Sequence, residues 1–196
     1  MGDSMSVRTI FRVLLIPLAL VVVAGCASPG GETPAAKRAE VAKMRSETLA
    51  TLYRVQPKAR QAIAKAHGYG VFSNVGVHVI FLSGGNGWGV VRDNKTGKDV
   101  YMKMLSGGVG FGLGVKDFRG VFVFTKRSAL KQFIESGWDA SAQADAAAKV
   151  GRKGDAFAGA ADVASGIKLY QLTESGLALQ VTLQGTKYWK DDELNR

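Results

Sequence analysis

The sequence predicts an α+β fold: an antiparallel, strongly bent sheet or small β-barrel built on glycine-rich strands, preceded by two N-terminal helices and carrying a short helix near 128–136. Runs rich in Val, Phe and Ile follow one another between residues 69 and 125 with short turns and no helical segment between them. This spacing is typical of an antiparallel meander. Two of the runs carry glycine at every second position, which favours sharp bends in a strand.

The first 25 residues have the features of a secretory signal. Arg8 and Arg12 precede the apolar run from Val13 to Ala24, which is short for a membrane span. The only cysteine follows in Val23-Ala24-Gly25-Cys26, which resembles a bacterial lipobox. We expect residues 1–25 to be removed and Cys26 to be acylated, with palmitate as a candidate chain. The alternative is cleavage elsewhere, or retention of the segment as an anchor.

The remaining chain has the length of one domain, with residues 26–33 as a flexible tether and 34–196 as the domain. Its basic balance, +10 for the whole sequence, favours anionic partners: a membrane surface, a polysaccharide or nucleic acid. The lipobox implies a periplasmic location, so nucleic acid is not expected. The absence of an aspartate after Cys26 favours the outer membrane. A single cysteine excludes disulfides within the domain and thiolate metal clusters, and we expect no metal or cofactor.

Two helices are expected at the start of the domain. Thr33 is a suitable N-cap and Pro34 fits the first turn. Helical spacing then predicts one buried face, made of Val41, Met44, Leu52 and Val55 with Thr48 between them. Pro57 ends this helix and can begin a second, from Pro57 to His67, which Gly68 stops.

These two helices carry eight basic side chains and few acidic ones. Next to a lipid anchor, such a segment suits an anionic headgroup surface. The equally weighted alternative is a solvated outer face on helices that pack inward. The candidate residues for binding an anionic surface are Lys37, Arg38, Lys43, Arg45, Arg54, Lys58, Arg60 and Lys65.

The expected strands and the short helix follow from alternation and turn signals. Asp93–Gly97 and Lys116–Asp117 are read as turns. Ser128 is expected to cap the helix Ser128–Ser136, which ends near Gly137. The strands expected are Tyr69–Leu82, Gly84–Arg92, Lys98–Leu105, Ser106–Val115 and Phe118–Thr125.

The alternating glycines lie in Gly85–Gly89 and in Gly108–Gly114. Within a strand they would leave one face bare and the other apolar. Tight curvature is one reason for such a face; close approach of a helix or a ligand is another. The second run also matches G-x-G-x-x-G, but period two within a strand argues against a nucleotide-binding turn.

The C-terminal part is less clearly patterned. Trp138–Lys149 is helical by propensity, although its alternating alanines also suit a strand. Ile167–Thr173 and Gly176–Gln184 predict a hairpin about Glu174-Ser175. In the tail, Tyr188–Asp192, we expect the aromatic side chains to pack and the charged ones to face water.

Taken together, several motifs resemble the SYLF family, a lipid-binding domain of bacterial lipoproteins and of eukaryotic membrane and actin regulators. The resemblance covers roughly Pro57 to the C-terminus, and the motifs stand in the family's order. It implies a small barrel or bent sheet flanked by helices, and makes the segment from Trp138 to Ala148 a strand. The matching motifs are Gly68–Phe72, Ser83–Val90, Gly108–Gly114, Ala129-Leu130 with Phe133, Asp139–Ser141 and Ser175–Leu177.

The resemblance implies binding of membrane phospholipid through the basic helical segment. The actin binding of eukaryotic relatives is not expected for this chain. The competing expectation is a structural or protein-interaction module of the cell envelope. Catalysis is not expected, because His67 and His78 are the only histidines and neither has a catalytic motif nearby. The sequence also contains no G-x-S-x-G or comparable signature.

Overall fold

A computed structural model describes residues 28–79, 82–109, 114–139, 160–173, 176–177 and 186–196. Its centre is an antiparallel sheet with the strand order β5-β9-β3-β2-β1-β4-β7-β6, in which β8 pairs with β7. The strands are β1 (Gly68–Val79), β2 (Leu82–Asp93), β3 (Asp99–Val109), β4 (Gly114–Phe124), β5 (Trp138–Asp139), β6 (Ala161–Ala164), β7 (Ile167–Thr173), β8 (Gly176–Leu177) and β9 (Thr186–Lys190).

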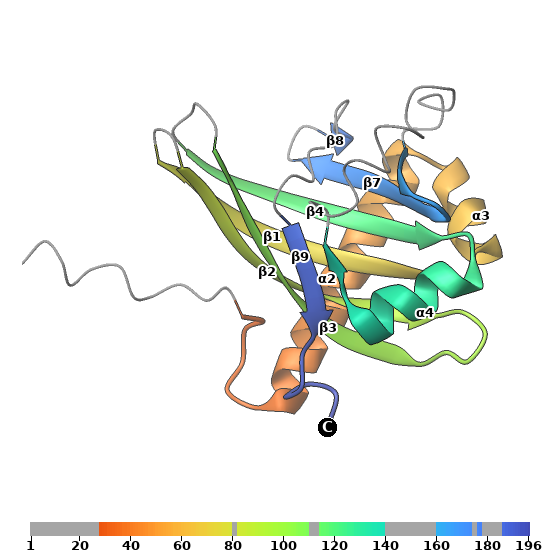
Figure 1. Cartoon of the computed structure of the whole chain (residues 1–196), viewed down its shortest axis with the longest axis horizontal. Helices are drawn as coiled ribbons and strands as arrows, with labels where there is room; N and C mark the ends of the chain where they lie inside the picture. The colour runs from red at the N-terminus through yellow and green to blue at the C-terminus, as the bar shows by residue number, and fades with distance from the viewer. Residues whose placement is uncertain (1–27, 80–81, 110–113, 140–159, 174–175, 178–185) are drawn as a thin grey trace, which may run out of the picture.

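The sheet curls into an open half-barrel (Figure 1), which confirms the α+β class and the strong bend. Two helices, α2 (Pro34–Val55) and α3 (Lys58–Lys65), precede it, and α4 (Arg127–Ser136) follows β4. Among the described strands, the two at the ends of the order, β5 and β6, do not pair with each other. The bent-sheet alternative therefore describes these residues better than a closed barrel.

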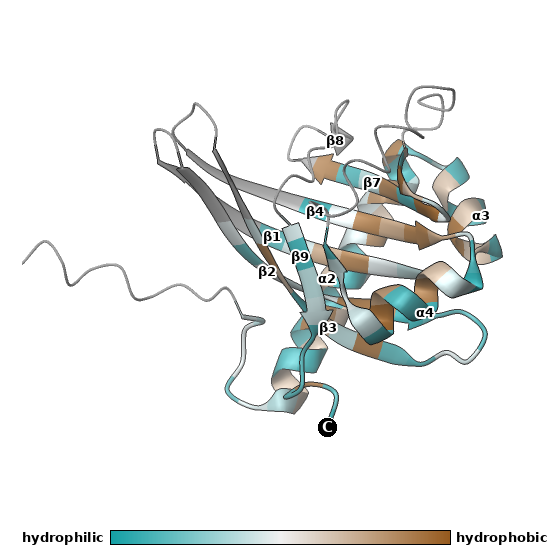
Figure 2. Ribbon diagram, in the orientation of Figure 1, coloured by the Kyte–Doolittle hydropathy of each residue, from teal (hydrophilic) through white to brown (hydrophobic). Residues whose placement is uncertain are grey.

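Both faces of the sheet are covered, and each face has its own core. On one face, Val41, Met44 and Leu52 of α2 pack on Val71 and Val121. The α4 helix lies across the other face (Figure 1). Hydrophobic residues are accordingly concentrated along β4, β7 and the adjoining part of α4 (Figure 2). Because successive strand residues point to opposite faces, a strand between two cores reads as an unbroken apolar run.

Aromatic rings fill the core beneath α4. Phe122, which is fully buried, lies at the centre of this cluster. Its ring centroid is 5.2–6.5 Å from the centroids of the rings of Phe72, Phe124, Phe133, Trp138 and Tyr188. Burial raises the pKa of the Tyr188 hydroxyl, so this side chain stays neutral at physiological pH.

The glycines of β2 mark close approach between strands. A Cβ on Gly89 would meet the carbonyl oxygen of Val71 and come within 2.5 Å of the Phe72 ring. A Cβ on Gly85 would lie 2.6 Å from the Asn74 side chain. The bare glycine face is thus closely approached by atoms of both neighbouring strands, β1 and β3, where a larger residue would not fit.

The second glycine run does not lie in one strand, so this prediction was wrong. β3 continues to Val109, paired with Leu82, and β4 begins at Gly114, paired with His78. Lys116-Asp117 is therefore part of β4 and not a turn. The predicted boundary at Ser106 failed because period two continues through it without a break.

The helix boundaries follow local signals, with one exception. Thr33 caps α2 by accepting a hydrogen bond from the Ala36 amide at 3.1 Å, and Pro57 separates α2 from α3, as predicted. Gly137 ends α4 with φ +75°. The N-cap of α4, however, is Lys126 and not Ser128, and its side chain makes no capping hydrogen bond.

An ion pair fastens the start of α4 to the turn between β2 and β3. The guanidinium of Arg127 donates to the Asp93 carboxylate at 2.6 Å, and the amides of Lys95 and Thr96 donate to the other carboxylate oxygen. The hydrogen bond from Arg127 is the main reason that the pKa of Asp93 lies well below its usual range. Asp93 therefore stays ionised and holds both the turn and the helix.

The C-terminal region is only partly described. The hairpin of β7 and β8 is present as predicted. β5 supplies a strand at Trp138-Asp139, whereas residues 140–159 and 178–185 lie outside the described residues. The expectation for the tail was wrong in two places: Trp189 is 42% exposed and Asp191 is buried. Asp191 is buried because its carboxylate accepts hydrogen bonds from the amides of Glu193 and Leu194.

Candidate functional site

The eight candidate basic residues divide into two groups, and three of them make contacts within the fold. Lys37 lies 2.8 Å from the Glu193 carboxylate, and Arg38 donates to the Leu194 carbonyl oxygen at 3.2 Å. Arg45 donates to the Asp99 carboxylate at 2.9 Å. These contacts hold α2 against the C-terminal tail and β3. The charged groups of the three residues are therefore bound within the fold.

Asp99 receives two guanidinium groups. Arg92 donates to both of its carboxylate oxygens at 2.6–2.7 Å, and Arg45 donates at 2.9 Å. Burial alone would raise the pKa of Asp99, but the hydrogen bonds from Arg92 and Arg45 outweigh it, and the pKa is lowered. The carboxylate is ionised at neutral pH, which keeps α2 attached to the sheet.

The other five candidate residues, Lys43, Arg54, Lys58, Arg60 and Lys65, are exposed, and none forms an ion pair with another described residue. Four of them gather where Pro57 turns the chain from α2 into α3. Val55 lies among them and is 41% exposed, which corrects its predicted place in the buried face of α2. We call Arg54, Val55, Lys58, Arg60 and Lys65 the α2–α3 surface.

The α2–α3 surface joins positive charge to apolar area. The guanidinium carbon of Arg60 lies 4.6 Å from the centroid of the Tyr53 ring, which positions this side chain. Long basic side chains can lay their stems on apolar surface while their charges contact anionic groups. The arrangement suits a broad anionic surface rather than a small ligand in a cleft.

A second exposed region lies on the strands near the C-terminus. The register places Trp88, Lys103 and Trp189 side by side on β2, β3 and β9, with Leu105 two residues further along β3. Leu105 and Trp189 are 47% and 42% exposed. We call these four residues the β3–β9 patch. In the sequence, this patch was indicated by the alternation along β9, which places Tyr188 inward and Trp189 outward.

The predicted lipid attachment site, Cys26, and the segment 1–25 lie outside the described residues. No helix among the described residues is long and apolar enough to cross a membrane. Within the same residues, no group of three or more His, Cys, Asp and Glu side chains could hold a metal ion. His67 is exposed at the start of β1, where its backbone amide donates to Phe124.

Two comparisons with known proteins bear on the family. A family model described as "Las17-binding protein actin regulator" (Ysc84) matches residues 105–196. A protein of Aeromonas veronii named "Beta cell expansion factor A" is 34% identical over 161 residues, which are 81% of this chain. The chain belongs to the SYLF family. The matched region is 60% of the Aeromonas protein, so this SYLF chain spans only part of the length of that relative.

The family model covers the half of the SYLF domain that contains the end of β3, β4, α4 and the C-terminal strands. The longer Aeromonas match takes in most of the remaining chain. Actin regulation and beta cell expansion are in the descriptions of those relatives.

Proposed function

We propose that this protein is a lipid-anchored component of the bacterial cell envelope whose SYLF domain binds anionic phospholipid surfaces. Acylation of Cys26 would anchor it on the outer membrane, facing the periplasm. The observation that carries the proposal is the α2–α3 surface, where Val55 is exposed and the four cations form no ion pair with another described residue. A lipid anchor supports it, because weak headgroup contacts suffice once the domain is held near a bilayer.

The anchor predicts covalent labelling at one residue. Cells that express the chain in the presence of labelled palmitate should incorporate the label into the wild-type protein, and Cys26→Ala should abolish it because no other cysteine is present. Ser28→Ala, two residues away, is the control and should retain the label. An unlabelled wild-type protein, or equal labelling of Cys26→Ala, would contradict the anchor.

The headgroup interaction predicts a specific loss of vesicle binding. The test form begins at residue 26 with Cys26→Ala and contains all described residues. Each cation near an anionic membrane contributes about 1 kcal/mol. Combining Arg54→Gln, Lys58→Gln and Lys65→Gln should therefore weaken binding at least about tenfold. The assay is sedimentation with vesicles of equal parts phosphatidylglycerol and phosphatidylcholine; Arg60 is kept because it packs on Tyr53.

The control has the same change in charge at another place: Lys98→Gln, Lys131→Gln and Lys190→Gln, all at exposed residues. It should bind these vesicles like the unsubstituted form. Binding should also weaken in high salt and be lost on pure phosphatidylcholine. Equal binding to both kinds of vesicle, or equal losses in the two triple variants, would refute headgroup recognition by the α2–α3 surface.

A second candidate function is a protein-interaction module of the envelope. The β3–β9 patch favours it, since exposed tryptophan and leucine at neighbouring strand positions are common in protein interfaces. If the domain fails to bind anionic vesicles while crosslinking in intact cells gives a partner that is lost in Trp189→Ser, this second function replaces the first.

A further inference from the structure

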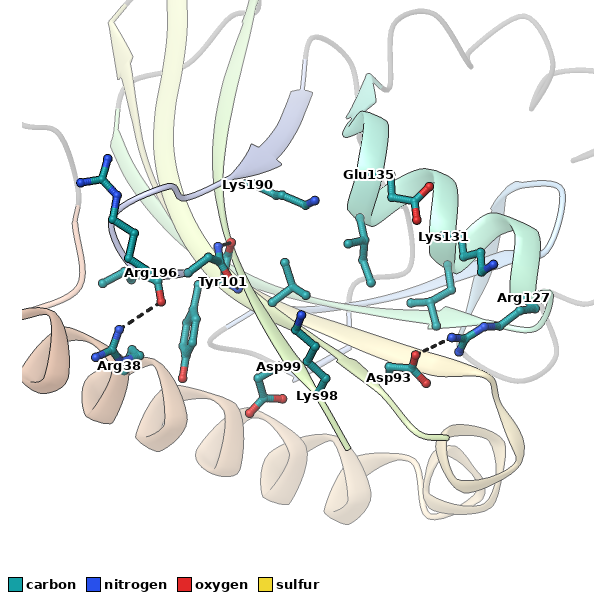
Figure 3. Close-up of a pocket in the computed structure, with 15 residues that line it drawn as sticks. Arg38, Asp93, Lys98, Asp99, Tyr101, Arg127, Lys131, Glu135, Lys190 and Arg196 are labelled. Carbon is teal, nitrogen blue, oxygen red and sulfur yellow. Dashed lines mark hydrogen bonds and ion pairs between the residues drawn. The ribbon is translucent and has the colours of Figure 1, made fainter. Parts of the chain in front are cut away.

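A groove of about 620 Å³ lies between α4, the start of β3 and the C-terminal segment (Figure 3). Cavities of about 300–1,000 Å³ are typical of small-molecule sites. The floor of the groove is apolar and includes Val100, Leu130 and Ile134. None of the candidate cations on α3 lines this groove, whereas Arg38 of α2 lines one end of it.

Lysines from three separate parts of the fold line this groove. Lys98 precedes β3, Lys131 lies on α4 and Lys190 ends β9 (Figure 3). None of the three ammonium groups forms an ion pair with another described residue. Like charges that share a cavity repel one another, so their convergence is unfavourable unless an anion joins them.

The carboxylates in the wall do not neutralise these lysines. Asp93 is paired with Arg127 at 2.6 Å, and Asp99 holds both Arg45 and Arg92. Glu135 is the remaining carboxylate among the side chains that line the groove, whereas Arg38 and Arg196 add two further cations. The groove is therefore positive after its internal ion pairs are counted.

The spacing of the lysines indicates the kind of anion. Lys190 pairs with Met102, and Lys98 lies four residues before Met102. At about 3.4 Å per residue, the two backbones are roughly 14 Å apart along the strand. An anion with several charged groups can give the lysines at the two ends of this distance separate partners, whereas on a single phosphate they would have to share one group.

We propose that this groove binds a small soluble anion that carries two or more phosphate or carboxylate groups. Lys98, Lys131 and Lys190 contact the charged groups, and the apolar floor lies beneath the body of the ligand. The site is separate from the α2–α3 surface and does not depend on membrane binding. The sequence did not indicate it, because the three lysines are far apart in the chain and meet only in the folded sheet.

The test is calorimetric titration with tripolyphosphate and, separately, citrate, against inorganic phosphate at equal ionic strength. The form that begins at residue 26 should bind at least one of the two multivalent anions and bind inorganic phosphate much more weakly. Lys98→Gln, Lys131→Gln and Lys190→Gln together should weaken binding at least about tenfold, because the variant lacks the three cations that contact the charged groups of the ligand. Which of the two anions binds identifies phosphate or carboxylate as the preferred group.

The matched control is the triple variant of the α2–α3 surface, which removes the same charge and should bind these anions like the unsubstituted form. All substituted lysines are exposed, so thermal unfolding should show that both variants are folded. Saturable binding lost only in the groove variant supports the site. Equal weakening in both variants, or no saturation by either multivalent anion at millimolar concentration, overturns it whatever the vesicle assay gives.

Discussion

Gly89→Ala is expected to lower the free energy of unfolding by about 3 kcal/mol or more, the upper range for overpacking a core. The new methyl group would meet the carbonyl oxygen of Val71 and the ring of Phe72, both on the paired strand β1. The carbonyl belongs to the backbone of a central strand, so it cannot move without disturbing the sheet. Urea unfolding followed by circular dichroism would measure the loss.

Gly120→Ala is the matched control in β4, which pairs with β1 on the side opposite β2, so that Gly89 and Gly120 are both paired with Phe72. There a Cβ would lie 3.4 Å from the nearest atom, a methyl carbon of Leu169, which is ordinary contact. We expect a change within about 1 kcal/mol, since alanine also restricts the unfolded chain. If Gly89→Ala were as stable as Gly120→Ala, the close approach of β2 to β1 would be wrong.

Phe122→Ala is expected to cost about 3–5 kcal/mol, the range for removing a buried aromatic ring. Phe122 is fully buried and lies against five other rings. Its loss therefore leaves a cavity that no neighbouring side chain can fill without breaking its own contacts. Because domains are stable by only about 5–15 kcal/mol, this variant should be partly unfolded well below the wild-type melting temperature. Calorimetry would give the shift.

Phe122→Leu is the companion variant, since it keeps most of the apolar volume and should cost much less. Leu105→Ala, on the exposed β3–β9 patch, should have little effect on stability. Equal losses for Phe122→Ala and Phe122→Leu would show that ring–ring contacts, and not filled volume, dominate this core.

The sequence was most informative where one residue determines local geometry. Thr33, Pro57 and Gly137 mark helix boundaries through a side-chain acceptor, a missing amide hydrogen and a positive φ, and these signals need no knowledge of the rest of the fold. Alternation likewise predicted the strands β1 and β2 closely. The family resemblance then supported the bent sheet.

Features that depend on contacts between distant parts of the chain were not predictable in this way. Glycine has no side chain to distinguish two faces, so the run from Gly108 to Gly114 did not reveal that β3 ends and β4 begins within it. The sequence could not show which of the basic residues form ion pairs within the fold and which are exposed. Arg45 pairs with Asp99 and Lys37 pairs with Glu193, and both carboxylates are far away along the chain. The groove lysines were missed for the same reason.

The pairing of β9 with β3 has a consequence for the order in which the domain can fold during synthesis. Until residues 186–194 are present, β3 lacks this neighbour, and Lys37 and Arg38 lack their partners, the Glu193 carboxylate and the Leu194 carbonyl oxygen. Contacts between such distant segments form late and carry a high entropic cost. The domain is therefore completed only once residues 186–196 are present, as one cooperative unit in which α2 gains its last contacts when β9 pairs with β3.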